Sequence, residues 1–268
     1  MLKVESLSLS YGGVSALKDI NFDVDEGELF SILGPNGAGK TSLFNCLSGL
    51  AKSEGSIAFE GRSLAGLKPH QIAGRGIGRT FQNLGLFGSM TVAENILVGS
   101  HRQIRGGALS AALAWPSTMR AELAARIRAD ELMELMDLTY WRDHVVSTLP
   151  YGTRKRVELA KAVASYPRLM LLDEPVAGMN KEETGDFIRY VLQVKEELNL
   201  TIVLIEHDVH MVMSISDRIL ALDFGEVIGL GTPAEIQRNS RVIEAYLGSS
   251  DNVNQSEQEQ AEKVAASE

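Results

Sequence analysis

The clearest pattern along the chain is a pair of continuously apolar runs, Leu169–Leu172 (LMLL) and Thr201–Ile205 (TIVLI). Runs of this kind are typical of central strands covered on both faces, as in a parallel sheet. Between them, apolar residues recur at steps of four, three and four, namely Phe187, Val191, Val194 and Leu198. This spacing predicts one face of a helix. Strand, helix and strand in this order predict a βαβ unit.

The N-terminal part of the chain has shorter apolar segments separated by glycine. Tyr11-Gly12-Gly13 ends the first segment, and Gly27 separates Asn21–Val24 from Glu28–Leu33. Gly55–Glu60 (GSIAFE) is a further short segment bounded by glycine. We therefore expect residues 1–60 to contain several short strands.

The stretch from about residue 84 to residue 149 breaks the alternation of strands and helices. Its apolar residues fall at helical steps, as in Ala125, Ala129, Leu132, Leu135 and Met136. We see no strand-like run nearby and predict a helical insertion. Within it, two glycines and a Trp-Pro pair predict a loop or a broken helix over residues 102–118. Near the end, Thr232-Pro233-Ala234-Glu235 predicts a helix start.

Composition narrows the class of protein. The 268 residues are 44% apolar and 23% charged, which is ordinary for a soluble globular chain. The formal charge of −9 argues against a nucleic-acid groove, which needs a basic surface. The single cysteine, Cys46, excludes an internal disulfide framework and a multi-cysteine zinc site, and we expect it to be a packed thiol.

Two further patterns bear on location. No run approaches the ~18 apolar residues that a membrane-spanning helix requires, and the first residues lack the apolar core of a secretion signal. We therefore expect a soluble chain in the cytosol. Residues 249–268 contain no aromatic side chain and are rich in acidic ones, which predicts a disordered acidic tail.

The strongest chemical signal is the segment GPNGAGKTS, which matches the phosphate-binding pattern GxxxxGK[ST]. A strand-like run (LFSIL) precedes it and a helical pattern follows it. Glycines keep the backbone N–H groups accessible to phosphate oxygens, and a helix N-terminus behind them favours an anion. Lys40 is expected to reach the β- and γ-phosphates, and the Thr41 hydroxyl is expected to ligate Mg²⁺. The expected nucleotide-binding residues are Gly34, Pro35, Asn36, Gly37, Ala38, Gly39, Lys40, Thr41 and Ser42.

A second acidic feature follows the first buried strand. Asp173 and Glu174 come directly after the apolar run in LLDEP. A phosphate loop requires an acid of this kind on the metal side, so Asp173 is expected to hold Mg²⁺. Glu174 is placed to take a proton from an attacking water molecule.

Five motifs stand in one order along the chain: the phosphate loop, RTFQ (79–82), LPYGTRKR (149–156), LLDEP (171–175) and IEHD (205–208). On these motifs the chain resembles an ABC ATPase cassette over about residues 1–248. The resemblance implies an α/β fold, a P-loop NTPase (RecA-like) core with a mixed sheet. It also implies an N-terminal antiparallel β subdomain and a helical subdomain inserted at about residues 84–160.

The resemblance also assigns roles. Tyr11 is similar to the aromatic residue that stacks on adenine. Gln82 is similar to the glutamine that senses the γ-phosphate and the metal, and His207 to the histidine that contacts the γ-phosphate. The remaining histidines have no such context and are expected to be exposed: His70, His101, His144 and His210.

The third motif departs from the common family form LSGGQ, because Pro150 replaces the serine and Tyr151-Gly152 follows. In the family this segment faces the nucleotide of a partner ATPase, so Tyr151 and Gly152 are expected to contact that nucleotide without the serine hydroxyl. Similarly, the loop after the LLDEP motif carries Asn180 where many cassettes have aspartate.

These departures, with the closing EAYLG (244–248), are similar to the LivG type of cassette, which powers import of branched-chain amino acids. The resemblance implies ATP and Mg²⁺ as ligands. It implies as partners two transmembrane permease subunits, a second ABC ATPase subunit in a head-to-tail dimer and an extracytoplasmic solute-binding protein, with no nucleic acid. The expected location is the cytoplasmic face of the cell membrane, where the segment 84–94 would contact the permease.

Other readings stay open. A soluble ABC-type ATPase could act on nucleic acid or ribosomes, although the long coiled-coil inserts or second cassette usual in that class are absent from the sequence. An importer of the same type could carry urea or amides. A P-loop GTPase is suggested by Asn180-Lys181-Glu182-Glu183, which nearly matches the guanine-reading pattern NKxD.

Overall fold

The computed structural model describes residues 1–80, 85–101 and 116–246, with the backbone alone for residues 116–118. The chain divides into two compact units. The first unit combines Met1–Gly66 with Leu204–Glu268, and the second unit is Leu67–Val203. The strand β8 (Thr201–Ile205) begins in the second unit and ends in the first.

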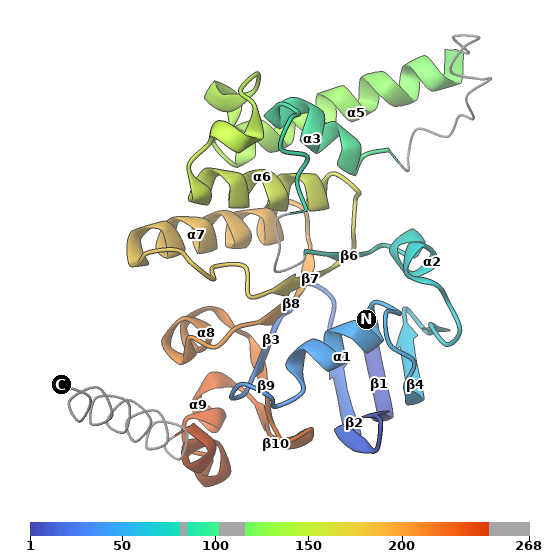
Figure 1. Cartoon of the computed structure of the whole chain (residues 1–268), viewed down its shortest axis with the longest axis vertical. Helices are drawn as coiled ribbons and strands as arrows, with labels where there is room; N and C mark the ends of the chain where they lie inside the picture. The colour runs from blue at the N-terminus through green and yellow to red at the C-terminus, as the bar shows by residue number, and fades with distance from the viewer. Residues whose placement is uncertain (81–84, 102–115, 247–268) are drawn as a thin grey trace, which may run out of the picture. The chain divides into compact units, whose positions relative to one another are not determined.

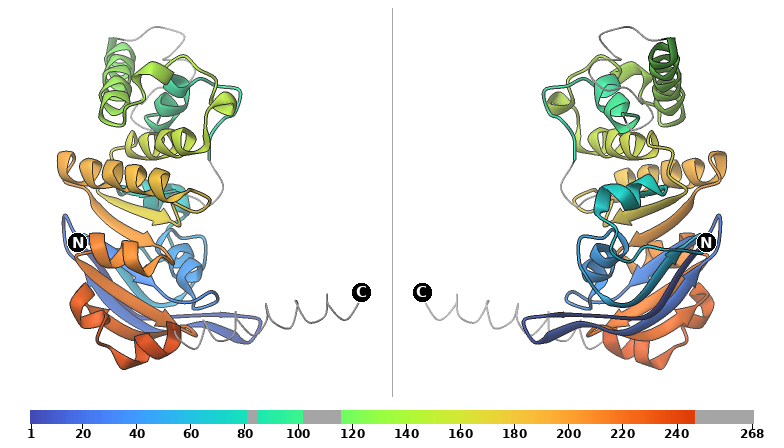
Figure 2. Two further views of the ribbon diagram at one scale, coloured as in Figure 1. Left: turned by 90° about the vertical axis from the view of Figure 1, so that its left-hand side faces the viewer. Right: turned by 90° about the vertical axis from the view of Figure 1, so that its right-hand side faces the viewer.

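The first unit contains an antiparallel sheet of strand order β2-β1-β4-β5. Its strands are β1 (Leu2–Tyr11), β2 (Val14–Val24), β4 (Glu54–Phe59) and β5 (Arg62–Ser63). β1 and β2 form the long dark-blue hairpin of Figure 2, and Tyr11 pairs with Val14 at its turn. One face of β1 is buried through Leu2, Val4, Leu7 and Leu9. The glycine turns therefore do separate strands, as predicted, but β1 and β2 have 10 and 11 residues and are longer than expected.

In the same unit, the strand that precedes the phosphate loop belongs to a mixed sheet. β3 (Leu29–Leu33) is buried along its whole length and runs parallel to β9 (Arg218–Asp223), which pairs antiparallel with β10 (Glu226–Gly231). The backbone N–H of Leu29 donates to Asp217 Oδ2 at 2.7 Å, which fixes the start of β3. The helices of this unit are α1 (Lys40–Leu47), α8 (Val209–Ile215), α9 (Pro233–Ile236) and a helical segment over residues 240–246.

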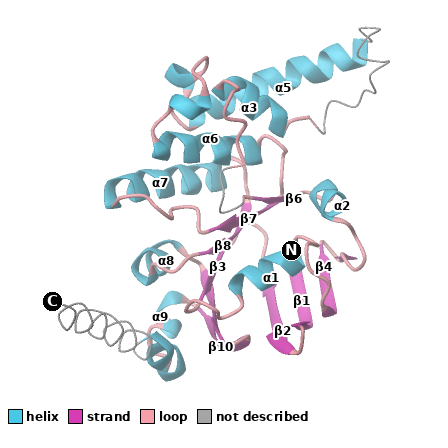
Figure 3. Ribbon diagram, in the orientation of Figure 1, coloured by secondary structure: helices cyan, strands magenta, loops and turns pink. Residues whose placement is uncertain are grey.

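The second unit carries most of the helices (Figure 1, Figure 3). The short strand β6 (Ile77–Arg79) runs parallel to β7 (Leu169–Asp173). The helices are α2 (Pro69–Gly74), α3 (Val92–Gly99), α5 (Pro116–Leu135), α6 (Tyr151–Val163) and α7 (Lys181–Glu197), with 3-10 turns at Thr139–Trp141 and Val146–Thr148. The fold is thus α/β, with a mixed sheet and a separate antiparallel sheet, as the sequence predicts.

Most of the predicted elements are confirmed. β7 and β8 coincide with the two apolar runs, α7 covers the predicted helical face, and Thr232 caps α9 in a capping box with Glu235. One boundary differs from the prediction, because α5 already begins at Pro116, whereas a loop or a broken helix was predicted up to residue 118. Proline is well suited to a first helical position, where its missing N–H has no partner to lose. The rest of that loop, residues 102–115, lies outside the described residues, as does the acidic tail.

The predicted helical insertion at about residues 84–160 stays a prediction. The second unit is wider, since it also contains β6, β7 and α7. No helix in the described part of the chain has both the length and the apolar character needed to cross a membrane.

Candidate functional site

The phosphate loop connects β3 to α1, because β3 ends at Leu33 and α1 begins at Lys40. A side chain at Gly34 would collide with the carbonyl oxygen of Leu222. At Gly39, where φ is +103°, a Cβ would lie 2.6 Å from the carbonyl oxygen of Ala16. By contrast, a Cβ at Gly37 would meet nothing within 4 Å. Two of the three glycines are therefore required by the surrounding backbone, and Gly37 lies on the open side.

Lys40 and Thr41 differ in exposure. The Lys40 ammonium is buried and donates to the carbonyl oxygens of Gly34 at 2.5 Å and Pro35 at 3.0 Å. Thr41 is exposed at the first turn of α1. The lysine is thus held over the loop by weak neutral acceptors, which a phosphate can replace with stronger charge-assisted bonds.

The turn between β9 and β10 supports the loop from outside the predicted motifs. The backbone N–H of Gly225 donates to the carbonyl oxygen of Ala38 at 3.1 Å, and Lys18 N–H donates to Gly225 O at 2.8 Å. A Cβ at Gly225 would lie 2.7 Å from Ala16 O. The sequence analysis missed this support. Its only signal was the pair Phe224-Gly225 between two strands, which looks like any hairpin turn.

Tyr11 and His207 also belong to the first unit. Tyr11 is 51% exposed at the end of β1. His207 follows β8 and is exposed, while the neighbouring Glu206 is fully buried and its carboxylate accepts from the His207 backbone N–H at 3.2 Å. Both side chains are therefore accessible to a bound ligand. The four other histidines are exposed, as expected.

Asp173 lies at the end of β7, buried, and forms a 2.9 Å ion pair with Arg79 of β6. The Asp173 N–H also faces Thr80 Oγ1 at 3.4 Å. Arg79 and Thr80 precede Gln82, and no sequence pattern indicated their contact with the acid. The pair compensates the buried carboxylate charge through one oxygen.

The other oxygen, Asp173 Oδ1, is buried and has no hydrogen-bond partner among the residues that the structure describes. An orphaned buried carboxylate oxygen suits a hard cation such as Mg²⁺. In the described ranges no group of three histidine, cysteine or acidic side chains could by itself hold a metal. This fits a magnesium ion that takes many of its ligands from phosphate and water rather than from a protein cage. Gln82, the remaining predicted metal ligand, lies outside the described residues.

Glu174 has an unusual backbone conformation, with φ at +45°. Non-glycine residues avoid this left-handed region, and strain of this kind gathers at functional sites. Ala177 N–H donates to the Glu174 carbonyl at 3.2 Å, so a tight turn follows. The strain turns the chain sharply just after Asp173 and leaves the Glu174 side chain half-buried.

The LPYGTRKR motif (149–156), here called the signature segment, lies in the second unit. It includes the start of α6, with Pro150 at the N-cap. The Tyr151 hydroxyl donates to the carbonyl oxygen of Ala177 at 3.0 Å, and the Tyr151 ring lies against Gly178. Asn180 caps α7, because its Oδ1 accepts from Glu183 N–H at 2.9 Å. Asn180, the first residue of the near match to the guanine-reading motif, therefore serves as a helix cap. The Tyr151 hydroxyl joins the start of α6 to the loop that follows β7.

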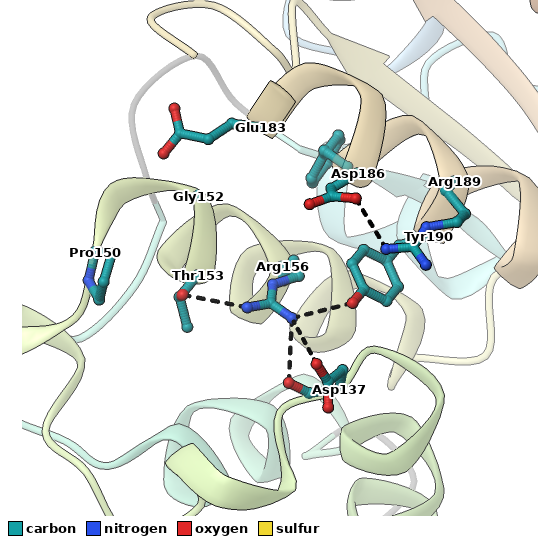
Figure 4. Close-up of a pocket in the computed structure, with 10 residues that line it drawn as sticks. Asp137, Pro150, Gly152, Thr153, Arg156, Glu183, Asp186, Arg189 and Tyr190 are labelled. Carbon is teal, nitrogen blue, oxygen red and sulfur yellow. Dashed lines mark hydrogen bonds and ion pairs between the residues drawn. The ribbon is translucent and has the colours of Figure 1, made fainter. Parts of the chain in front are cut away.

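A cavity of about 280 Å³ opens beside Pro150 and Gly152 (Figure 4). Arg156 lies at its centre and donates to the carbonyl oxygens of Met136 at 3.0 Å and Asp137 at 3.1 Å, and to Thr153 Oγ1 at 3.3 Å. Its Nη1 also faces the Tyr190 hydroxyl at 3.3 Å. Arg156 thus fixes the first turns of α6 to its neighbours. The sequence analysis quoted this residue in the motif but gave it no role.

α6 also contacts Gly85. Glu158 accepts from Gly85 N–H at 3.4 Å and lies 3.4 Å from Lys155, while the Lys161 ammonium donates to the Gly85 carbonyl. Burial raises the pKa of Glu158, and Lys155 opposes this shift. α6 is therefore hydrogen-bonded directly to Gly85, which follows Gln82 closely in the chain.

Comparison with protein families agrees with this arrangement. Residues 17–177 match the family model described as ABC transporter, and residues 226–252 match the one described as branched-chain amino acid ATP-binding cassette transporter. Among curated proteins, the high-affinity branched-chain amino acid transport ATP-binding protein BraF of Pseudomonas aeruginosa is 41% identical over 92% of this chain and 98% of its own. LivG of Salmonella typhimurium is 42% identical over the same shares.

Solved structures give the same result. A nucleotide-free ATP-binding cassette from an ABC transporter superposes with a TM-score of 0.78, at 28% identity over 92% of this chain and 98% of that one. A structure of an ABC transporter cassette in its ADP conformation has a TM-score of 0.78 at 27% identity, with the same coverage. The chain therefore belongs to the ABC transporter ATPases, within the group of branched-chain amino acid ATP-binding cassettes.

Proposed function

We propose that this chain is the ATP-hydrolysing subunit of a branched-chain amino acid importer, bound peripherally to the cytoplasmic face of the cell membrane. One observation carries the proposal. A phosphate loop with a buried lysine stands in a chain whose residues 226–252 match the branched-chain cassette model. The named relatives at 41–42% identity are transport proteins for these amino acids.

ATP binds along Gly34–Ser42, where the N-terminus of α1 and the exposed loop amides favour the phosphates. Lys40 leaves the carbonyl oxygens of Gly34 and Pro35 and donates to the β- and γ-phosphates. The gain is a charge-assisted hydrogen bond in place of a neutral one. The exposed Tyr11 ring stacks on the adenine.

The residues proposed to hold Mg²⁺ are Thr41, Gln82 and Asp173, and the orphaned Asp173 oxygen supports the assignment. The bound ion neutralises charge on the phosphate oxygens. Arg79 orients the Asp173 carboxylate through its other oxygen, Oδ2.

Hydrolysis is assigned to Glu174 and His207, with Gln82 as the γ-phosphate sensor. Glu174 accepts a proton from the attacking water, and the strained backbone at this residue supports a dedicated placement of its carboxylate. His207 contacts the γ-phosphate from its exposed position after β8.

The partners are a second ABC ATPase subunit, two transmembrane permease subunits and, through them, an extracytoplasmic solute-binding protein. Tyr151 and Gly152 at the start of α6 face the nucleotide of the other ATPase. The permease contact includes Phe87, which is 49% exposed. The fully buried Asn95 bonds to both the N–H and the carbonyl of Phe87, at 2.8 and 3.0 Å, so the aromatic side chain projects from a rigid turn.

The test replaces Lys40 in cells that otherwise lack the chain. With Lys40→Ala, uptake of labelled leucine, isoleucine and valine should fall to the level of cells without the chain. The control is Lys52→Ala, which removes an exposed lysine outside the loop and should leave uptake unchanged. If Lys40→Ala abolishes uptake of urea or amides instead, the proposed solute is wrong. If it abolishes no uptake, the proposed transport role is wrong.

A further inference from the structure

α5, at the edge of the second unit in Figure 2, carries apolar side chains on two opposite faces. One face is buried in the unit through residues at helical steps, namely Ala125, Ala129, Leu132 and Met136. On the opposite face Met119, Leu123 and Ile127 are 61%, 60% and 51% exposed. Their spacing of four residues aligns them on successive turns, and we call them the outer stripe. A surface helix needs one apolar face to pack, so the core does not account for the outer stripe.

The outer stripe ends beside a short turn of another segment. Asp130 lies three residues after Ile127 and therefore on the same side of α5. Its carboxylate accepts a hydrogen bond from Arg142 Nη1 at 2.6 Å. This ion pair ties the turn at Thr139–Trp141, here called the aromatic turn, to the end of the outer stripe.

Three rings gather at the aromatic turn. Tyr140 is 77% exposed, and its ring centroid lies 5.0 Å from that of Trp141 and 5.5 Å from that of His144. Tyrosine and tryptophan combine an apolar ring with a polar tip, and they are enriched where lipid meets water. The outer stripe is thus followed by the side chains that a bilayer surface favours.

The charges divide along α5. Over residues 116–128, the three basic side chains Arg120, Arg126 and Arg128 stand against one acid, Glu122, which gives this half a formal charge of +2. The acids of the second half begin at Asp130, where the outer stripe ends. The stripe therefore lies on a locally basic part of a chain whose formal charge is −9. A basic surface of this kind complements anionic lipid headgroups.

The size of this surface favours lipid over a second protein chain. A stable protein interface takes about 20–30 residues and ~800 Å² on each side. The outer stripe and the aromatic turn supply only a few exposed side chains. A small apolar contact is sufficient for a protein that other subunits already hold at a membrane, because tethering raises the effective concentration of the surface.

We propose that the outer stripe and the aromatic turn dock on the anionic surface of a lipid bilayer, as a second membrane contact beside the permease. The inference rests on the proposed peripheral location. Leu123 and Ile127 insert among the upper acyl chains, and Tyr140 lies at the boundary with water. Arg120 and Arg126 face the lipid phosphates.

Flotation of the full chain with vesicles of phosphatidylglycerol and phosphatidylethanolamine tests the proposal. The wild-type chain should float with these vesicles, and less with phosphatidylcholine alone or in high salt. Leu123→Ser should lower the partition coefficient about five- to twentyfold, because the apolar side chain no longer enters the bilayer. The matched control is Leu50→Ser, the same change on a leucine that is 53% exposed just after α1. It should partition like the wild type.

A second measurement locates the contact. In a Trp115→Phe background, Trp141 is the only tryptophan of the chain. Its fluorescence should be quenched by anionic vesicles that contain brominated lipid. Arg120→Glu should weaken this quenching, because the reversed charge is repelled by the lipid phosphates. Arg62→Glu, which makes the same change at an exposed position of β5, should not.

A wild-type chain that does not float overturns the proposal, and so does an equal loss of flotation in Leu123→Ser and Leu50→Ser. A chain that dimerises through the outer stripe and leaves Trp141 unquenched also overturns it, since a second copy would then be the occupant. A chain that supports uptake without lipid contact overturns this inference alone. A chain that floats as expected but fails the uptake test overturns the proposed transport role alone.

Discussion

At the scale of single residues, two acids of the proposed site have unfavourable features, a strained backbone at Glu174 and an unpartnered oxygen at Asp173. Glu174 adopts a φ of +45°, which costs roughly 1 kcal/mol or more for a residue with a side chain. Asp173 keeps one buried oxygen without a hydrogen-bond partner in the described chain and binds Arg79 through the other. Unfavourable features of this kind cluster at functional sites.

Glu174→Gln should separate binding from hydrolysis. The amide keeps the size of the carboxylate but cannot accept the proton of water, so we expect the ATPase rate to fall by about 10²- to 10⁴-fold. The Kd for ATP should change by less than about twofold, because the phosphate contacts are untouched. Steady-state phosphate release and equilibrium binding measure the two quantities.

The control for that variant is Glu182→Gln, which changes an exposed glutamate in the first turn of α7. It should keep full activity. Undiminished hydrolysis in Glu174→Gln would show that another group is the base.

At the scale of elements, α6 unites functions that are distant in the sequence. Its first residue, Tyr151, bonds to the loop that follows β7, and Arg156 bonds to the chain that follows α5. Glu158 and Lys161, in the middle of α6, form hydrogen bonds with Gly85.

The buried Glu158 predicts a pH dependence of stability. Burial raises its pKa in the folded state above the ordinary value of 4.5, so the folded chain binds this proton more tightly than the unfolded chain. The contribution of Glu158 is most favourable below pH 4.5 and is lost as the pH rises through the folded-state pKa. Glu158→Gln should therefore gain stability relative to the wild type as the pH rises from about 4.5 towards neutrality.

Urea unfolding of both proteins between pH 4 and pH 7 measures this difference. Glu134→Gln, at an exposed position of α5, is the matched control and should follow the wild-type pH profile. If the difference between Glu158→Gln and the wild type does not change with pH, the pKa of Glu158 is not raised in the folded chain.

At the scale of the whole molecule, the predicted nucleotide residues are divided between the two compact units. The phosphate loop, Tyr11 and His207 belong to the first, and Asp173, Glu174 and the signature segment belong to the second. A ligand that binds the folded chain alone stabilises it in proportion to the logarithm of its concentration over Kd. Nucleotide binding should therefore appear as a rise in thermal stability of the intact chain.

MgATP at a hundred times its Kd should add about 2.7 kcal/mol and raise the thermal midpoint by roughly 5–10 °C. GTP at the same concentration should have a smaller effect, because Asn180 serves as a helix cap and does not read guanine. Lys40→Ala should show no shift with ATP. Differential scanning calorimetry makes the comparison, and an equal or larger shift with GTP would contradict the adenine assignment.

Local sequence patterns predicted most of the elements and the chemical candidates, because both depend on local order. Continuous apolar runs identified β7 and β8, helical steps identified α5 and α7, and GPNGAGKTS identified the phosphate loop together with its lysine. The three-residue strand β6 has too few residues for a pattern, and it was missed.

Only the tertiary structure decided which residues support those candidates. The Arg79 contact to Asp173, the Gly225 bond to Ala38 and the packing of Tyr246 against the Leu33 cluster each join residues that are far apart in the chain. Local patterns carry no information about such pairs, since their contact depends on how strands and turns come together in space. Asn180 is the reverse case. A motif-like string turned out to be a local helix cap, and its backbone geometry alone distinguishes the two.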